Sequence, residues 1–208
     1  MEDWYIPSVE TNIINASPKG KLIFIHGVSG SGKSTIGKEL CSTFNNSVWI
    51  DQDQFYHKEK PLITFTNDDN TLFYTETNWD SEEAIDFQSF REKINELRYK
   101  FNYVIVTGFA LRLHLLRLKA DYSFLLVFNV SDEKAIEIVT KTRMESKRFN
   151  TLEKIEKDYW MVRKAVWPFY LDTLEKIELS ICVNAFIDGQ RLSSSAITRT
   201  IVKYINST

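Results

Sequence analysis

A glycine-rich run directly after a short apolar segment constrains the fold more than any other feature of the chain. Residues 27–34 read Gly-Val-Ser-Gly-Ser-Gly-Lys-Ser. Residues 21–26 before the run are mostly β-branched or aromatic, which predicts a strand that stops at the first glycine. After the run, apolar residues recur at four-residue spacing between positions 36 and 44, which predicts one face of a helix. A strand, a glycine turn and a helix in immediate succession predict a loop that closes around an anionic group.

The run matches the Gly-x-x-x-x-Gly-Lys-Ser pattern of phosphate-binding loops in full. Its glycines permit positive φ, so that backbone N–H groups face inward, and the following helix adds unpaired N–H groups. We expect Lys33 to reach the β- and γ-phosphates of ATP and Ser34 to ligate Mg²⁺. The alternative is a glycine-rich turn that binds nothing, and the flanking strand and helix argue against it. The predicted nucleotide-binding loop residues are Gly27, Val28, Ser29, Gly30, Ser31, Gly32, Lys33, Ser34 and Thr35.

The rest of the chain alternates apolar runs of strand length with segments of helical period. We expect strands at 48–50, 103–106, 123–128 and 181–183 with 186–187, and helices at 84–97, 131–143, 151–178 (interrupted at Pro168) and 197–205. This alternation predicts a three-layer α/β fold of the P-loop NTPase type, with a parallel sheet flanked by helices. We expect one domain over residues 1–208, with a helical lid at roughly 141–160 and an acceptor-side flap at roughly 57–80 that is either irregular or contains a short hairpin.

Two aspartates, Asp51 and Asp53, follow the second expected strand. Ligands of parallel sheets bind at the carboxyl ends of the strands, so these side chains are expected beside the glycine-rich loop. A carboxylate at that place accepts a hydroxyl proton or holds a metal. The alternative is a pair of solvated turn aspartates, and their spacing alone does not decide between the two.

Several short motifs, in order along the chain, resemble those of the nicotinamide riboside kinases, within the wider uridine kinase group of P-loop kinases. The resemblance runs from about Lys21 to Gly189. Its motifs are Gly-x-Ser-Gly-Ser-Gly-Lys-Ser-Thr at 27–35, Gln-Asp-x-Phe-Tyr at 52–56, Asn-Trp-Asp at 78–80, Val-Thr-Gly-Phe at 106–109, Trp-Pro-Phe-Tyr at 167–170 and Asp-Gly at 188–189. Only the first is specific by itself, and the others gain weight from their order and intervals.

The resemblance implies catalytic roles for Lys33, Asp53 and Arg143. Asp53 matches the aspartate that acts as general base or, with Ser34, as metal partner. Arg143 matches the lid position from which an arginine contacts the transferring phosphate, where a fixed positive charge offsets the charge of the phosphoryl group. The alternative for Arg143 is a solvated helix end. Asp188 matches the loop that passes near adenine, so it joins the predicted nucleotide site.

The resemblance also implies a substrate site made by Tyr56, Trp79, Asp80 and Phe109. Asp80 matches the carboxylate that grips ribose hydroxyls, and a carboxylate can accept two hydrogen bonds from a diol. Trp79 stands where an aromatic ring stacks on the base, and a cationic pyridinium ring would gain cation–π attraction there. The alternative for Trp79 is a core position.

Thr107 departs from the family pattern, because these kinases usually carry glutamate before Gly-Phe at the end of the third strand. That glutamate typically supports the metal site. Three interpretations stay open: Ser34 and Asp53 hold the metal together with phosphates and waters, another carboxylate such as Asp51 or Glu76 substitutes, or catalysis is weak.

The resemblance therefore implies a small-molecule kinase that transfers the ATP γ-phosphate to the 5′-hydroxyl of a riboside, with nicotinamide riboside as the leading acceptor. Ser81 after the ribose-binding aspartate favours this acceptor, since uridine kinases usually carry histidine there. The alternatives are a uridine or cytidine kinase, and a nucleotide-binding regulatory protein with weak or no kinase activity.

Composition argues against several other classes of protein. The net charge of −2 provides no strong field for nucleic acid or for an anionic membrane surface, so neither is an expected partner. No apolar run approaches the roughly 18 residues that span a bilayer, and the acidic start of the chain is unlike a secretory signal. The two cysteines match no metal-ligand spacing. We expect a cytoplasmic protein, and the oligomeric state stays open.

Overall fold

The computed structural model describes residues 20–109, 113–147, 151–176, 180–187 and 190–208. Its main sheet has the strand order β2-β5-β1-β6-β7-β8. These strands are β1 (Lys21–Gly27), β2 (Ser47–Asp51), β5 (Tyr103–Gly108), β6 (Tyr122–Asn129), β7 (Ile181–Ile187) and β8 (Gln190–Arg191). All neighbours pair in parallel except β7 with β8. The order places β1 between β5 and β6, and the glycine-rich loop therefore starts from the interior of the sheet.

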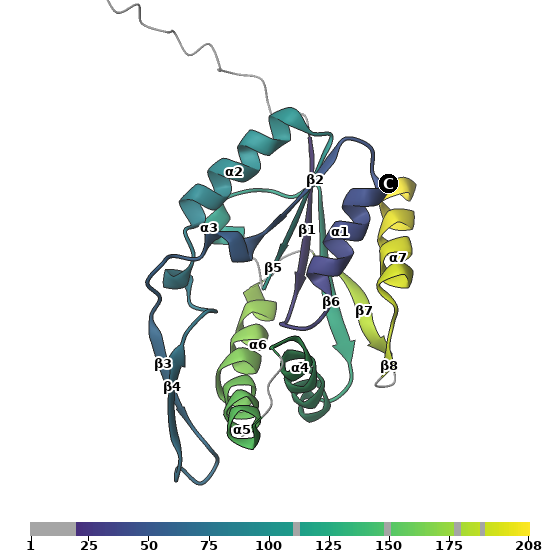
Figure 1. The fold of residues 1–208 in the computed structure, drawn as a ribbon. Helices are drawn as coiled ribbons and strands as arrows, with labels where there is room; N and C mark the ends of the chain where they lie inside the picture. The colour runs from purple at the N-terminus through teal and green to yellow at the C-terminus, as the bar shows by residue number, and fades with distance from the viewer. Residues whose placement is uncertain (1–19, 110–112, 148–150, 177–179, 188–189) are drawn as a thin grey trace, which may run out of the picture.

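Helices cover both faces of this sheet, as Figure 1 shows. They are α1 (Lys33–Thr43), α2 (Phe87–Lys100), α3 (Leu113–Leu116), α4 (Asp132–Lys147), α5 (Leu152–Met161), α6 (Trp167–Lys176) and α7 (Ser194–Ser207). Alternate residues of β1 separate two cores: Ile23 and Ile25 pack with residues of α1 and α7, while Leu22 and Phe24 pack with residues of α2. All four are fully buried, which explains why this strand reads as a continuous apolar run. The three-layer α/β fold and its strands are confirmed.

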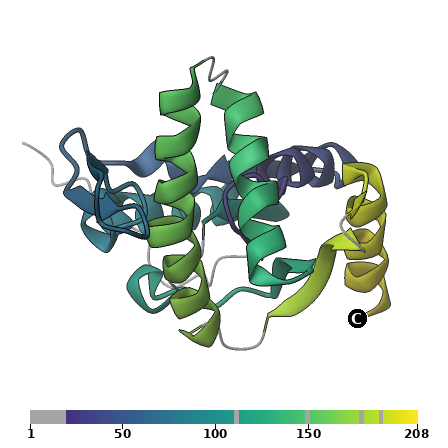
Figure 2. The same ribbon diagram turned by 90° about the horizontal axis from the view of Figure 1, so that it is seen from below.

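The segment α4 to α6 stands over the carboxyl ends of the parallel strands. Figure 2 shows α4 beside the helical stretch formed by α5 and α6. The sequence predicted that Pro168 interrupts this stretch, and that prediction is wrong: a π-helix, Val162–Val166, leads directly into α6. Proline lacks an N–H and its ring clashes with the carbonyl four residues earlier in an α-helix. The wider π turn directly before Pro168 accommodates both effects.

The expected flap contains a regular β-hairpin outside the main sheet (Figure 1). Its strands, β3 (Leu62–Thr66) and β4 (Phe73–Thr77), pair antiparallel. Phe65 is buried among residues of α4, α6 and the π-helix, so the hairpin packs against the helices over the sheet. Within the described residues, no helix is both long and apolar enough to cross a membrane.

Candidate active site

The loop between β1 and α1 has the conformation that its glycines predict. Gly30 has φ of 80° and Gly32 has φ of 93°, both in the left-handed region that side chains avoid. A Cβ on Gly30 would also lie 2.9 Å from the side chain of Thr142 on α4. Gly32 caps α1, and within the described residues no side chain caps this end. The first N–H groups of α1 therefore point toward the loop, where a phosphate would accept their hydrogen bonds.

Lys33 reaches from the first turn of α1 into a cavity beside the loop. Its Nζ lies 3.5 Å from the carbonyl oxygen of Val28. Loss of hydration lowers the pKa of Lys33, while the negative charges of Asp53 and Asp51 act in the opposite direction. The ammonium is thus held where another anion, such as a phosphate tail, would stabilise its charge.

The cavity beside the loop has a volume of about 330 Å³, which suits a small ligand. Its lining comes from the loop, from the ends of β2 and β5, from the flap and from α4 and α5. The lining residues are Ser29, Lys33, Asp53, Tyr56, Trp79, Asp80, Phe109, Arg143 and Met161. All of these except Met161 are site residues that the sequence analysis named. Segments far apart in the chain therefore meet at one cavity.

The carboxylate that contacts Ser34 belongs to Asp51 and not to Asp53, which the family resemblance predicts as the metal partner of Ser34. Ser34 Oγ donates to Asp51 Oδ2 at 2.7 Å, and Thr107 Oγ1 donates to the same oxygen at 2.9 Å. The other oxygen, Asp51 Oδ1, accepts from the backbone N–H of Asp53 at 3.2 Å. This last bond caps the 3₁₀ turn Gln52–Phe55, which directs Asp53 into the cavity.

Asp53 and Tyr56 form a pair on the same turn. Asp53 is open to solvent on the cavity side, yet the surrounding walls reduce its hydration, and this burial raises the pKa of its carboxyl. The charge of Asp51 raises this pKa further, while Lys33 and a hydrogen bond from Tyr56 lower it. Burial together with the nearby aspartates also raises the pKa of Tyr56, so its phenol stays a hydrogen-bond donor.

Aromatic rings form the outer wall of the cavity. Tyr56 and Trp79 meet edge to face with centroids 5.0 Å apart, and Trp79 is 47% exposed, which excludes the alternative of a core position. Lys60 Nζ lies over the Trp79 ring at 4.4 Å from its centroid. Phe109 stacks on Phe169 at 5.7 Å. The exposed face of Trp79 offers a flat apolar surface to a planar ligand.

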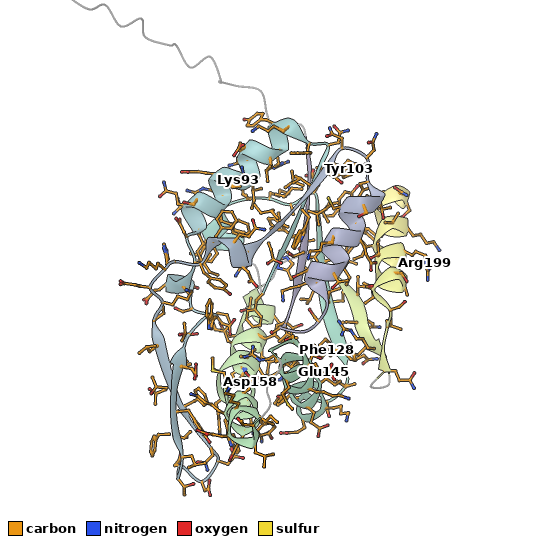
Figure 3. The ribbon with its side chains drawn as sticks, viewed as in Figure 1. Lys93, Tyr103, Phe128, Glu145, Asp158 and Arg199 are labelled. Carbon is orange, nitrogen blue, oxygen red and sulfur yellow. The ribbon has the colours of Figure 1, made fainter. Side chains whose placement is uncertain are left out.

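Arg143 reaches the loop from α4. Its Nε and Nη2 donate to the two carboxylate oxygens of Asp158 at 2.9 and 2.8 Å, and its Nη1 lies 3.4 Å from Ser29 Oγ. Figure 3 labels Asp158 on α5, facing α4. The two partners are 13% and 6% exposed, so the guanidinium is fixed in a largely buried fork. This contact excludes a solvated helix end as the role of Arg143.

The remaining predicted residues lie as follows. Gly27 and Val28 end β1 and begin the loop, Ser31 is buried in it, and Thr35 is exposed on α1. Asp188 lies outside the described residues. Sequence reasoning missed Asp158, Met161 and Lys60, because no spacing rule joins them to the motifs. It also missed Arg191, whose guanidinium lies beside Gly32 of the loop: a Cβ added to this glycine would be 3.0 Å from Arg191 Nη2.

The residues next to Ser34 fit a magnesium ion. Among the described residues, no three His, Cys, Asp or Glu side chains gather into a metal-binding group. Mg²⁺ does not require such a group, because it keeps several waters and binds phosphates with one or two protein oxygens. The Ser34 hydroxyl and the Asp51 carboxylate provide hard oxygen donors of this kind.

Comparison with curated proteins gives partial matches. A nicotinamide riboside kinase of Saccharomyces cerevisiae is 33% identical over 82 residues, which are 39% of this chain and 32% of that protein. A uridine kinase of Clostridium tetani is 35% identical over 80 residues, which are 38% of this chain and 35% of that protein. The chain resembles nicotinamide riboside and uridine kinases. The matched segments span about a third of the length of these relatives.

One solved structure supports the fold. An uncharacterized protein from Eubacterium ventriosum has a TM-score of 0.50 at 16% identity and covers 90% of this chain and 99% of its own. A shikimate kinase from Bacteroides thetaiotaomicron has a TM-score of 0.48 at 15% identity, with coverage of 89% and 98%. At identities of 15% and 16%, structural similarity is informative about the fold alone. No model of a known protein family matches the chain.

Proposed function

We propose that this protein is an ATP-dependent kinase that phosphorylates the 5′-hydroxyl of a riboside. The observation that carries the proposal is the shared cavity of Lys33, Asp53 and Asp80. A phosphate-binding lysine and two carboxylates from different strand ends line one space of small-ligand size, as a transfer between two bound substrates requires.

The proposed chemistry follows from these positions. The loop N–H groups and Lys33 hold the triphosphate, and Arg143 offsets charge on the γ-phosphoryl group during transfer. Bound Mg²⁺, held by Ser34 with the carboxylate beside it, would neutralise phosphate charge. Asp53 accepts the proton of the acceptor hydroxyl while the oxygen of that hydroxyl forms a bond to the γ-phosphorus. The bond from that phosphorus to the bridging oxygen breaks, and ADP leaves.

The proposed acceptor is held at the outer wall of the same cavity. Asp80 accepts hydrogen bonds from the ribose hydroxyls, Trp79 stacks on the base, and Tyr56 and Phe109 bound the space between them. Nicotinamide riboside is the first acceptor to test, because the S. cerevisiae relative carries that name. Uridine is the second, on the name of the C. tetani relative.

The same proposal assigns the larger segments. Residues 1–208 form one kinase domain, residues 141–160 act as the lid that brings Arg143 to the phosphates, and residues 57–80 act as the acceptor-side flap. The two cysteines, Cys41 and Cys182, are free thiols, which favours a reducing compartment such as the cytoplasm.

A coupled assay of ADP release tests the proposal. The purified protein is given ATP, Mg²⁺ and one acceptor at a time: nicotinamide riboside, uridine, cytidine, adenosine or pantothenate. We expect ADP release with at least one riboside and none with Lys33→Ala. ATP binding without turnover of any riboside would contradict the proposal and favour the alternative of a regulatory nucleotide-binding protein.

A further inference from the structure

Two neighbouring strands end in side chains that share one hydrogen-bonded cluster. Asp51 is the last residue of β2 and is in register with Thr107 on β5. Asp51 is 7% exposed and Thr107 is fully buried. Thr107 is the position where the family resemblance predicts a glutamate, so the negative charge at this corner of the sheet comes from the adjacent strand instead.

The direction of every hydrogen bond in the cluster is fixed by chemistry. Trp49 Nε1 can only donate, and it donates to Thr107 Oγ1 at 3.0 Å. Thr107 therefore turns its own proton toward Asp51 Oδ2, at 2.9 Å. Ser34 also donates its proton to that oxygen, at 2.7 Å. With its proton directed toward Asp51, Ser34 keeps its lone pairs free for a cation beside the phosphate loop.

Close packing holds this cluster in one arrangement. A Cβ on Gly37 of α1 would lie 2.6 Å from Thr107 Cγ2 and 2.6 Å from the Trp49 ring, so helix and strands touch here without space for another side chain. Within this packed cluster, Asp51 on β2 contacts both Ser34 and Thr107.

We propose that Asp51 is the positioning carboxylate of the magnesium site: it accepts the hydrogen bond from Ser34 and so orients the lone pairs of that hydroxyl toward the cation. The inference rests on the proposed function. It separates the two aspartates: Asp51 does not line the cavity and acts through Ser34, whereas Asp53 lines the cavity and faces the acceptor.

Binding of Mn²⁺, followed by electron paramagnetic resonance in the presence of ADP, tests this inference without turnover. We expect Asp51→Asn to weaken Mn²⁺ binding by about tenfold or more, as loss of a group that orients a ligand usually does. The control is Glu59→Gln, which removes an exposed carboxylate outside the cavity lining and is expected to keep the wild-type Mn²⁺ affinity. Unchanged Mn²⁺ affinity in Asp51→Asn would overturn the inference.

A double-mutant cycle tests the route through Ser34. Ser34→Ala and the double variant with Asp51→Asn are expected to bind Mn²⁺ equally weakly, because Asp51 acts through a hydroxyl that is already gone. Additive losses would overturn this route. If Asp51→Asn fails to fold, Asp51→Glu keeps the charge but displaces it from Ser34. It is expected to lose Mn²⁺ affinity at unchanged ADP affinity, and full retention would overturn the inference.

The outcome for the wild-type protein separates the two proposals. A wild-type protein that binds no ADP contradicts the proposed kinase function itself. A wild-type protein that binds ADP and Mn²⁺, with an Asp51→Asn variant that binds both equally well, contradicts only the role of Asp51.

Discussion

Arg143 on α4 and Asp158 on α5 are joined by two parallel hydrogen bonds, at 2.9 and 2.8 Å, that leave the third guanidinium nitrogen directed at Ser29 of the glycine-rich loop. A guanidinium that is held on two of its nitrogens can present only one edge to a phosphate. Asp158 thus determines where the positive charge of Arg143 lies.

Removing the charge of Asp158 is expected to slow the reaction. Asp158→Asn leaves Arg143 without its bidentate partner, and we predict a kcat at least about tenfold lower in steady-state assays. The double variant Arg143→Met/Asp158→Asn should be no slower than Arg143→Met alone, since Asp158 acts through Arg143. The control, Glu156→Gln, changes an exposed carboxylate on the same helix and should keep wild-type kcat. A further loss in the double variant would contradict this account.

Asp53→Asn is expected to lower the activity and to raise the stability of the folded protein. Loss of the general base should reduce kcat on the order of 10²-fold. Burial raises the pKa of Asp53 above its usual 3.8, so the folding stability falls as the pH rises through that raised pKa. At pH 7 the carboxyl is ionised, and its ionisation destabilises the folded protein. A neutral asparagine removes this cost, so Tm at pH 7 should rise slightly, because solvent on the exposed side of Asp53 screens much of the effect, and the difference should disappear below pH 3.8. A lower Tm at pH 7 would contradict this sign.

The hydrogen bond from Tyr56 to Asp53 predicts how the pH dependence of the reaction responds to a mutation of Tyr56. Asp53 must be ionised to accept a proton, so kcat/KM falls as the pH drops through its pKa. The hydrogen bond from Tyr56 lowers that pKa by stabilising the ionised form. Tyr56→Phe keeps the ring but removes this bond, and the acid limb of kcat/KM should therefore move to higher pH. An acid limb that stays in place, or moves to lower pH, would exclude Asp53 as the titrating group.

Lys60 is expected to influence which base the site accepts. Its ammonium already lies over the Trp79 ring, so a cationic pyridinium on the same ring meets a like charge that a neutral pyrimidine does not. We predict that Lys60→Met raises kcat/KM for nicotinamide riboside relative to uridine by roughly fivefold, which corresponds to about 1 kcal/mol of charge repulsion. Lys58→Met, an exposed lysine on the same segment, should leave this ratio unchanged. A ratio that Lys60→Met does not alter would exclude this effect.

The sequence predicted the parts of the site that depend on local pattern. The glycine-rich loop specifies its own conformation, and parallel strands bring their carboxyl ends together, so Lys33 and Asp53 were expected at one place. Trp79, Asp80 and Arg143 followed from motifs of the resemblance, and they line the same cavity.

The residues that escaped prediction depend on tertiary geometry. The bond between Asp51 and Ser34 depends on how α1 packs against β2, which the sequence does not state. The pairing of Arg143 with Asp158 depends on how α4 packs against α5. The continuation of the helix through Pro168 depends on a π turn, which local sequence periodicity does not predict.

Direct detection of the transferred group tests the central claim. The protein is incubated with ATP labelled in its γ-phosphate, Mg²⁺ and either nicotinamide riboside or uridine, and the products are separated and identified by mass. The account predicts a riboside 5′-phosphate that carries the label with the wild-type protein, and none with Lys33→Ala. Label found only in inorganic phosphate or still in ATP, with every riboside unmodified, would contradict it.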